Sequence, residues 1–331
     1  MRFGPVPVRQ AEGAILAHSI RTGSLRVRKG KTLDRDDVAK LLAAGVSEVV
    51  VARLENGDVD ENEAASQLAA GLSIAPSDPS ISMSTAFTGR VNVTAKQAGV
   101  VQVDAAKITA FNQVCPEITL ATVPDFHMAD EGAMLATVKV IAFGVKQADV
   151  RRAAACVKDA ITLAPPTLSS AVLIVSTLAN DSPEKGIEAT RARLGRWNVD
   201  LRQVDVVAHT QSALSDALAN ANADLILILT ASATSDIYDV APAAVKSAGG
   251  QIERFGMPVD PGNLLFIGSL DQRPVIGLPG CARSPALNGA DWVLSRIVCG
   301  ISVQDRDISA MGVGGLLKEI PTRPHPRRKS V

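Results

Sequence analysis

The chain has 331 residues, 47% of them hydrophobic and 21% charged, a composition that indicates a folded protein of about two domains and excludes a disordered chain. Its 34 basic residues balance 34 acidic ones, so net charge gives no support for a general attraction to nucleic acid or an anionic membrane. With only two Trp, one Tyr and seven Phe, the core must be aliphatic, which favours parallel strands under helices and argues against a stacking surface for single-stranded nucleic acid.

Cysteine and histidine usage points to reduced thiols without a metal centre. The four cysteines are scattered, no CxxC motif occurs and only four histidines are present, so a structural zinc or iron–sulfur site is not expected. The first residues lack the apolar segment of a secretion signal, and no apolar run approaches the ~18 residues of a membrane span. We therefore expect a cytoplasmic protein with neither a nucleic-acid nor a membrane partner.

Residues 1–165 are expected to form an α+β accessory region. The elements predicted first are a short helix Val6–Ala17, a helix Asp34–Ala44, a strand Val46–Ala52 and a helix Glu61–Leu72. The helix from Asp34 has acidic residues in its first turn and Gly45 after its end. Short Val- and Thr-rich segments between Gly89 and Val145 predict strands, and Asp149–Ile161 has the pattern of an amphipathic helix.

Residues 166–318 are expected to form a three-layer α/β domain with a mainly parallel sheet. The predicted strands are Ala171–Thr177, Val204–Ala208, Asp224–Leu229, Leu264–Gly268 and Val275–Leu278. The predicted helices are Pro183–Arg196, Thr210–Ala219, Val240–Ala248 and Ser284–Val298. Strands that are apolar on both faces and alternate with helices are typical of such a sheet. Residues 319–331 are basic and proline-broken, and predict a flexible tail or linker.

In such a sheet, ligands bind in the loops at the carboxyl ends of the strands. The first such loop, residues 230–239, carries four hydroxyl groups, those of Thr230, Ser232, Thr234 and Ser235. Asp236 and Asp239 could hydrogen-bond a ligand ring or hold Mg²⁺. Either could equally cap the next helix, and spacing alone does not separate the two interpretations.

The second loop, residues 256–263, contains two prolines and two glycines, which impose a rigid turn that brings the backbone close to its surroundings. Its candidate binding residues are Asp260, Pro261, Gly262 and Asn263. A purely structural connection explains the same pattern.

The third loop leads from a strand to the last long helix, and its candidate residues are Pro279, Gly280, Cys281, Arg283 and Ser284. Ser284 is the predicted N-cap, with Pro285 at the first helical position. Free N–H groups at a helix start favour an anion, and Arg283 could add a bidentate phosphate contact. Cys281 could be a reactive thiolate or simply a small buried residue.

Several common site motifs are missing. Neither GxxxxGK[ST] nor GxGxxG after the first strand occurs, which argues against nucleoside triphosphate and dinucleotide sites. No Ser-His-Asp or Cys-His pairing can be read from the sequence, and His209 near a strand end is interpreted as structural.

Three segments of the second half resemble the molybdopterin-binding domain of MoeA- and MogA-type proteins. They are DLILILTASATSDIYD, GMPVDPGNLL and VIGLPGCARSPALNGADWVL. GRVNVTAKQAGVVQVD and LATVKVIAFGV in the first half resemble a branch of this superfamily that is often fused to a molybdenum-cofactor nucleotidyltransferase domain. The chain departs from the family pattern in two places. Its Thr-Gly-Gly loop is Thr230-Ala231-Ser232-Ala233, and its Asn-Pro is Cys281-Ala282.

The resemblance implies binding of molybdopterin or molybdenum cofactor, in cofactor biosynthesis or hand-over. The pterin phosphate would lie near Gly280–Ser284, the ring along residues 230–239 with Asp236 or Asp239 accepting its N–H groups, and Asp260–Asn263 would close one side. Two alternatives stay open. One is a molybdenum insertase or pterin nucleotidyl or adenylyl transferase, which would use Mg²⁺ with ATP or CTP and Asp236 and Asp239 as catalytic candidates. The other is a non-catalytic scaffold for a nucleotidyltransferase or molybdoenzyme. The resemblance also implies a homo-oligomer.

Overall fold

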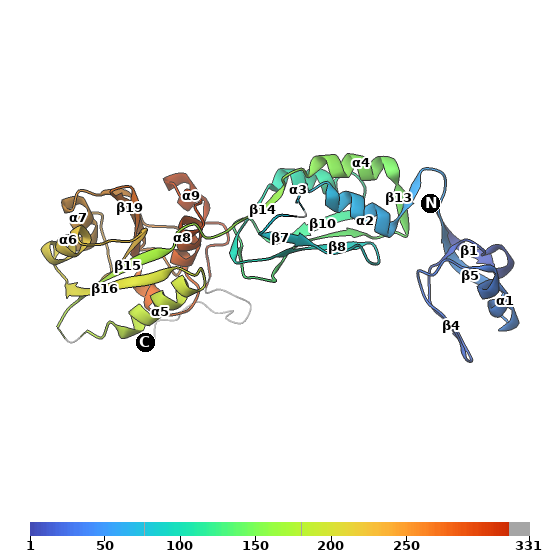
Figure 1. The fold of residues 1–331 in the computed structure, drawn as a ribbon, viewed down its shortest axis with the longest axis horizontal. Coiled ribbons are helices and arrows are strands. Elements are labelled where there is room, and N and C mark those ends of the chain that lie inside the picture. The colour runs from blue at the N-terminus through green and yellow to red at the C-terminus, as the bar shows by residue number, and fades with distance from the viewer. Residues whose placement is uncertain (76, 180, 318–331) are drawn as a thin grey trace, which may run out of the picture. The chain divides into compact units, whose positions relative to one another are not determined.

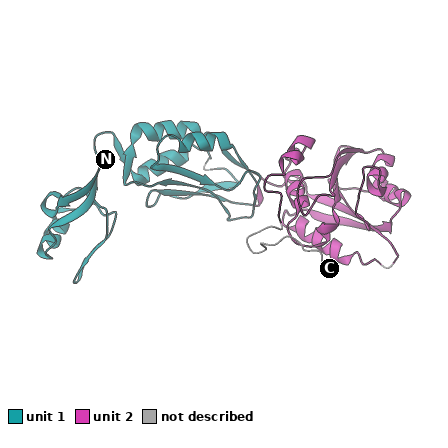
Figure 2. Ribbon diagram, turned by 180° about the vertical axis from the view of Figure 1, so that it is seen from behind, with its two compact units in different colours: residues 1–97, 101–163 teal, residues 98–100, 164–331 magenta. Residues whose placement is uncertain are grey.

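The computed structural model describes residues 1–75, 77–179 and 181–317 (Figure 1). The chain divides into two compact units, unit 1 with residues 1–97 and 101–163, and unit 2 with residues 98–100 and those from 164 onward (Figure 2). The tail expected at residues 319–331 lies outside the described residues. Among the described helices, none is both long and apolar enough to cross a membrane.

The start of unit 1 is a small β-structure. Strands β1 (Arg2–Pro7), β5 (Glu48–Arg53) and β2 (Ile15–Leu16) form an antiparallel sheet, beside a hairpin of β3 (Ile20–Thr22) and β4 (Leu25–Val27). Helix α1 (Arg35–Ala43) packs there, and its N-cap Asp34 forms a capping box with Asp37.

The helix expected over Val6–Ala17 is wrong, because that segment contributes β1, a single 3-10 turn and β2. Pro5 and Pro7 have no N–H to donate. They are accommodated because β1 lies at the edge of its sheet, paired only with β5.

The rest of unit 1 contains a four-stranded sheet covered by helices, a three-stranded sheet and a two-stranded sheet. Its strands are β6 (Asp58–Asp60), β7 (Ile81–Met83), β8 (Arg90–Ala95), β9 (Gly99–Val103), β10 (Ile118–Thr122), β11 (Met128–Ala129), β12 (Met134–Val140), β13 (Gly144–Lys146) and β14 (Ile161–Ala164). Its helices are α2 (Glu61–Ala70), α3 (Ala105–Asn112) and α4 (Gln147–Cys156). The antiparallel sheet β10-β12-β8-β7 carries the three helices on one face (Figure 1). The three-stranded sheet has the order β11-β9-β14, and the two-stranded sheet consists of β13 and β6. Helix α4 ends five residues earlier than predicted, and Ile161 begins β14 instead.

Unit 2 is built on a six-stranded sheet of order β16-β15-β17-β20-β19-β18. The strands are β15 (Ser170–Thr177), β16 (Asp200–Ala208), β17 (Leu225–Leu229), β18 (Gln251–Phe255), β19 (Phe266–Leu270) and β20 (Arg273–Leu278). The helices are α5 (Glu184–Gly195), α6 (Gln211–Ala219), α7 (Val240–Ser247), α8 (Gly289–Val298) and α9 (Asp305–Ala310). Strands β16, β15, β17 and β20 are parallel, whereas β19 and β18 are each antiparallel to their neighbours. The sheet is therefore mixed.

Aliphatic side chains pack both faces of this sheet. Helices α6 and α7 cover the face that carries Ile174 and Ile228. Helix α5 lies on the other face, where Leu229 packs so closely that a Cβ on Gly186 would stand 2.5 Å from it. The ring of Phe266 lies over its cross-strand partner Gly277, where a Cβ would stand 1.9 Å from the ring. A glycine at 277 therefore makes room for one of the few core aromatics.

Asp224, just before β17, joins the amino ends of two adjacent strands. One carboxylate oxygen accepts hydrogen bonds from the Ser169 N–H (2.9 Å), the Ser169 hydroxyl (2.9 Å) and the Ser170 N–H (3.0 Å). These bonds favour the ionised form and hold the pKa of Asp224 at about 2. The side chain thus fixes the starts of β15 and β17 relative to each other.

We predict that Asp224→Ala destabilises unit 2 at neutral pH by about 1–2 kcal/mol, because the three donors lose a charged partner. The folded-state pKa lies below the ordinary 3.8, so the stabilisation is present above about pH 4 and is lost as the pH falls toward 2. Urea unfolding followed by tryptophan fluorescence measures this, since both tryptophans, Trp197 and Trp292, lie in unit 2. Asp216→Ala on exposed α6 is the control. A difference between the two variants that does not shrink between pH 7 and pH 3 would contradict the assignment.

Candidate functional site

The three loops singled out from the sequence lie at one edge of the unit 2 sheet. Strands β17 and β20 are parallel neighbours, so residues 230–239 and 279–286 leave the sheet side by side. Strand β18 runs in the same direction as β20, since each is antiparallel to β19. Residues 256–263 therefore leave at the same edge. The sheet topology therefore places the three candidate loops at one edge, whereas the sequence identified each loop only by itself.

Three of the four Ser and Thr hydroxyl groups in the loop after β17 make contacts within the loop itself. Thr230 and Thr234 are buried, and Thr230 Oγ1 donates to the Ser232 carbonyl oxygen (2.6 Å) and lies 3.5 Å from Thr234 Oγ1. Ser235 Oγ donates to the Ala233 carbonyl (3.2 Å). Ser232 and Ser235 are exposed, so these two remain reachable by a ligand.

The two acids of this loop are engaged by the main chain. Asp239 is the N-cap of α7: its Oδ1 accepts from the Val240 N–H (2.7 Å) and its Oδ2 from the Ser235 N–H (2.9 Å). Asp236 Oδ1 accepts from the Tyr238 N–H (2.8 Å). Within the described residues no group of three or more His, Cys, Asp or Glu side chains could hold a metal ion. Each carboxylate oxygen of Asp239 thus accepts one amide hydrogen bond, and Asp236 accepts one at Oδ1.

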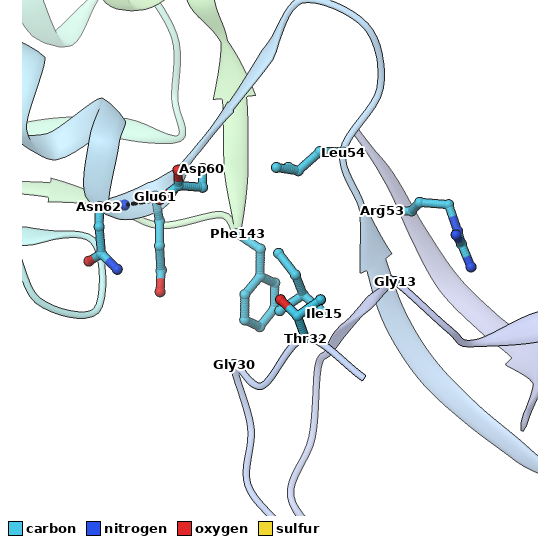
Figure 3. Close-up of a pocket in the computed structure, with 10 residues that line it drawn as sticks. All are labelled: Gly13, Ile15, Gly30, Thr32, Arg53, Leu54, Asp60, Glu61, Asn62 and Phe143. Atoms are coloured by element: carbon cyan, nitrogen blue, oxygen red, sulfur yellow. Dashed lines mark hydrogen bonds between the residues drawn. The ribbon is translucent and has the colours of Figure 1, made fainter. Parts of the chain in front are cut away.

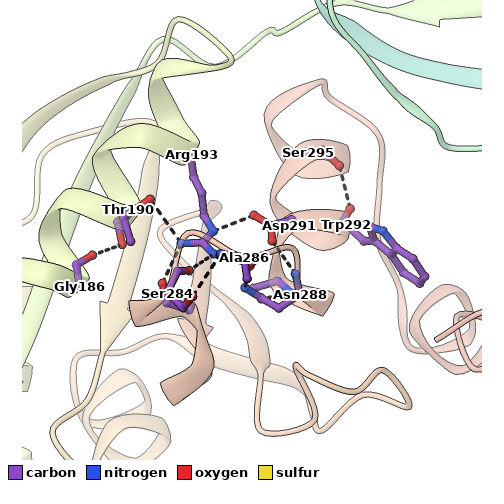
Figure 4. A network of polar contacts seen from close by, with 12 residues as sticks. Gly186, Thr190, Arg193, Ser284, Ala286, Asn288, Asp291, Trp292 and Ser295 are labelled. Atoms are coloured by element: carbon purple, nitrogen blue, oxygen red, sulfur yellow. Dashed lines mark hydrogen bonds and ion pairs between the residues drawn. The ribbon is translucent and has the colours of Figure 1, made fainter. Parts of the chain in front are cut away.

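The loop after β20 is held by a buried arginine of α5 (Figure 4). Arg193 Nε donates to Asp291 Oδ1 at 2.7 Å, with side-chain exposures of 7% and 14%. The other guanidinium N–H groups donate to main-chain carbonyl oxygens, those of Ala189, Ala282, Ser284 and Ala286. All donors of the guanidinium are therefore satisfied, which is the condition for burying a charge at low cost.

The last long helix begins later than the sequence suggested. Ser284 and Pro285 were expected to open it, but Ser284 lies in the preceding loop, and the N-cap is Asn288. Asn288 and Asp291 form a capping box, and the Gly289 N–H donates to the Pro261 carbonyl (2.8 Å). The first amides of α8 are thus occupied and an acid sits in its first turn. A phosphate at this helix start is disfavoured.

Arg283 connects two of the candidate loops. Its Nη2 donates to the Thr230 carbonyl oxygen (2.6 Å), whereas its Nε and Nη1 make no hydrogen bond within the described residues. It borders a cavity of about 300 Å³ whose other lining residues are Lys185, Glu188, Ala189, Ala192 and Pro285. Lys185 has no ion pair among the described residues. Two cations and one carboxylate therefore surround this cavity.

The loop after β18 packs against the start of α8. A Cβ on Gly262, which has φ of +143°, would stand 2.7 Å from the Gly289 nitrogen. Asn263 Nδ2 donates to the Met257 carbonyl (3.2 Å). The main chain of Asp260 pairs with residues 315–317, with its N–H donating to Gly315 and its carbonyl accepting from Leu317. Pro261 and Gly262 are buried by these contacts, so this loop is mainly a support.

One polar contact at this edge was not predicted. Ser176, fully buried at the end of β15, accepts a hydrogen bond from the Ala231 N–H (3.2 Å) and lies 2.8 Å from Nδ1 of His209. The ends of β15, β16 and β17 are joined through this one hydroxyl. The strand-exit rule applied to the first strand of the domain would have drawn attention to Ser176.

Known proteins match this chain over its first residues in sequence and more distantly in structure. A family described as "Domain of unknown function (DUF8806)" matches residues 5–53. A search of curated proteins found no match. Among solved structures, the chain is similar to the molybdopterin biosynthesis moea protein from Pyrococcus horikosii, with a TM-score of 0.32, 12% identity and coverage of 90% of this chain and 75% of that one.

A molybdenum cofactor biosynthesis protein from Pyrococcus furiosus is similar with a TM-score of 0.25 and 14% identity, covering 91% of this chain and 66% of that one. Both similarities are distant, and no argument about function rests on them.

We predict that Arg193→Met destabilises unit 2 by about 3–5 kcal/mol, because it leaves Asp291 and several carbonyl groups without their donor. Arg191→Met, on an exposed position of the same helix, is the matched control and should change stability little. Urea unfolding followed by tryptophan fluorescence distinguishes them. Equal midpoints for the two variants would show that the network does not hold the loop.

Proposed function

We propose that unit 2 binds molybdopterin or the molybdenum cofactor at the carboxyl edge of its sheet, as part of cofactor biosynthesis or hand-over. The observation that carries the proposal is the Arg283–Thr230 hydrogen bond. It joins the two loops that resemble the family's binding segments, and it leaves Nε and Nη1 of Arg283, a residue that lines a cavity, without a hydrogen bond among the described residues. The pterin phosphate would be bound there by Arg283 and Lys185, in place of the helix start that the sequence suggested.

The pterin ring would lie along residues 230–239, where Ser232 and Ser235 are exposed. Asp236 keeps one carboxylate oxygen without a hydrogen bond among the described residues, and that oxygen would accept from the ring N–H groups. Asp239 is less suited, because releasing its two amide donors would uncap α7. Residues 260–263 would close one side through main-chain and apolar surface.

Binding without catalysis is favoured over the transferase and insertase alternatives. Those alternatives need acids that hold Mg²⁺, and a metal on Asp239 would compete with the two amide hydrogen bonds that its carboxylate accepts. We extend the proposal to a cytoplasmic homo-oligomer that hands its ligand to a nucleotidyltransferase or molybdoenzyme, which the family resemblance supports.

The phosphate position is tested by titrating the full chain with molybdopterin. Arg283→Ala should weaken binding about tenfold or more, because it removes a charge-assisted contact. Lys185→Ala should weaken it less, and Glu188→Gln should strengthen it, since the same wall loses a negative charge. Arg191→Ala is the neutral control. No binding by the native chain would contradict the proposed function, and unchanged affinity in Arg283→Ala would contradict the phosphate position.

Catalysis is tested by incubating the protein with molybdopterin and Mg²⁺-ATP or Mg²⁺-CTP. We expect tight binding and no nucleotide transfer or pyrophosphate release. Turnover that disappears in Asp236→Ala and persists in Asp216→Ala would contradict a binding role and support the enzyme alternative.

A further inference from the structure

Unit 1 contains a cavity of about 630 Å³ to which the sequence analysis assigned nothing (Figure 3). It is lined on one side by residues of the first 53 positions and on the other by the start of α2 and by Phe143. Its volume is in the range of small-molecule sites, about 300–1,000 Å³. The inference drawn from it concerns unit 1 alone and does not rest on the function proposed for unit 2.

One wall of the cavity is apolar and aromatic. Phe143 is half-buried, and its ring lies beside Ile15, with Leu54 extending from the far side (Figure 3). The chain has only seven phenylalanines, so few aromatic rings are available to line a cavity, and Phe143 is one that does. Such a wall suits a flat ligand ring.

On the same side of the cavity as Phe143 stands a carboxylate that has no hydrogen-bonding partner among the described residues. Glu61, the first residue of α2, lies beside the Phe143 ring (Figure 3). Among the described residues its carboxylate makes no hydrogen bond and no ion pair, and burial raises its pKa above the usual range. The polar groups next to it are occupied: Asp60 caps α2, and Asn62 Oδ1 accepts from the Gly89 N–H (2.9 Å). Glu61 is only partly buried, and a partly desolvated acceptor left without a donor favours a ligand that supplies one.

The charges near the carboxylate decide between a cationic and a neutral donor. Lys29 and Lys139 both act on Glu61 electrostatically, and the Lys29 ammonium lies 5.5 Å from the centre of the Phe143 ring. These two cations would repel a positively charged ligand. Arg53 is occupied by the carbonyls of Gln10 and Glu12 and offers no anion site. A neutral ligand with N–H donors fits this combination.

We propose that the cavity binds a neutral planar heterocycle with a 2-amino-4-oxopyrimidine edge, the edge that guanine and pterins share. Its ring N–H and its amino group would both donate to the Glu61 carboxylate, and its face would lie on the side of the Phe143 ring that the Lys29 ammonium does not cover. Adenine, which presents a ring acceptor at the equivalent position, would leave one carboxylate oxygen unpaired and place two acceptors together.

Calorimetric titration of the full chain tests this, with guanosine and unsubstituted pterin as separate arms that distinguish the two sources. At least one should bind with a Kd below about 1 mM, and adenosine should bind about tenfold more weakly or worse. Glu61→Gln should weaken that binding about tenfold. Glu63→Gln, an exposed acid on the same helix, should leave it unchanged.

Phe143→Leu keeps the wall apolar but removes the ring, and should weaken binding about threefold or more. It serves as the second variant if Glu61→Gln does not fold. No binding of either heterocycle to the native chain would overturn the proposal, as would equal affinity in Glu61→Gln. Agmatine binding that needs Glu61, without heterocycle binding, would also overturn it and assign the cavity to a cation.

Discussion

The candidate site depends on the buried ion pair between Arg193 and Asp291. The guanidinium fixes the carbonyl groups of residues 282–286, and the same carboxylate completes the capping box that starts α8. Arg283 reaches Thr230 from this loop, and Gly289 contacts Pro261 from this helix start. A side chain of α5 therefore fixes the loop after β20, and through Arg283 and Gly289 that loop and the helix start contact the other two loops. The ion pair is nearly buried and every N–H group of the guanidinium is hydrogen-bonded. It therefore fixes the conformation of residues 282–286, which have little regular secondary structure.

The sequence predicted elements whose signals are local. Strand β17 is a continuous aliphatic run, and α6 begins after Thr210, whose hydroxyl accepts from the Ala213 N–H. The start of α8 was misplaced because Ser284-Pro285 is itself a good helix opening. What prevents a helix there is Arg193, 91 positions away from Ser284, which binds its carbonyl. Similarly, β1 exists only because β5 pairs with it, and no short window of sequence contains that information.

For the functional residues, the sequence located the loops but not the state of each side chain. The sequence offers the same two interpretations, ligand binding or helix capping, for Asp236 and Asp239. In the structure only Asp239 accepts an amide hydrogen bond at each carboxylate oxygen. His209 looked solitary because its partner, Ser176, lies 33 positions away on another strand. Glu61 could not be identified at all, since an acid in the first turn of a helix is ordinary. Only the cavity and the absence of a partner among the described residues set it apart.

The scarcity of aromatic residues distinguishes the two units as hosts for a flat ligand. At the edge of unit 2, Tyr238 is 82% exposed, so it forms no wall. A pterin there would be held by hydroxyl, amide and guanidinium groups, and its affinity would depend on charge and salt. In unit 1, Phe143 borders a cavity beside the Glu61 carboxylate, so a ring would be held by stacking and paired N–H donors. Affinity there would depend little on salt concentration. The salt dependence of binding therefore distinguishes the two sites, even for ligands that share the same heterocyclic edge.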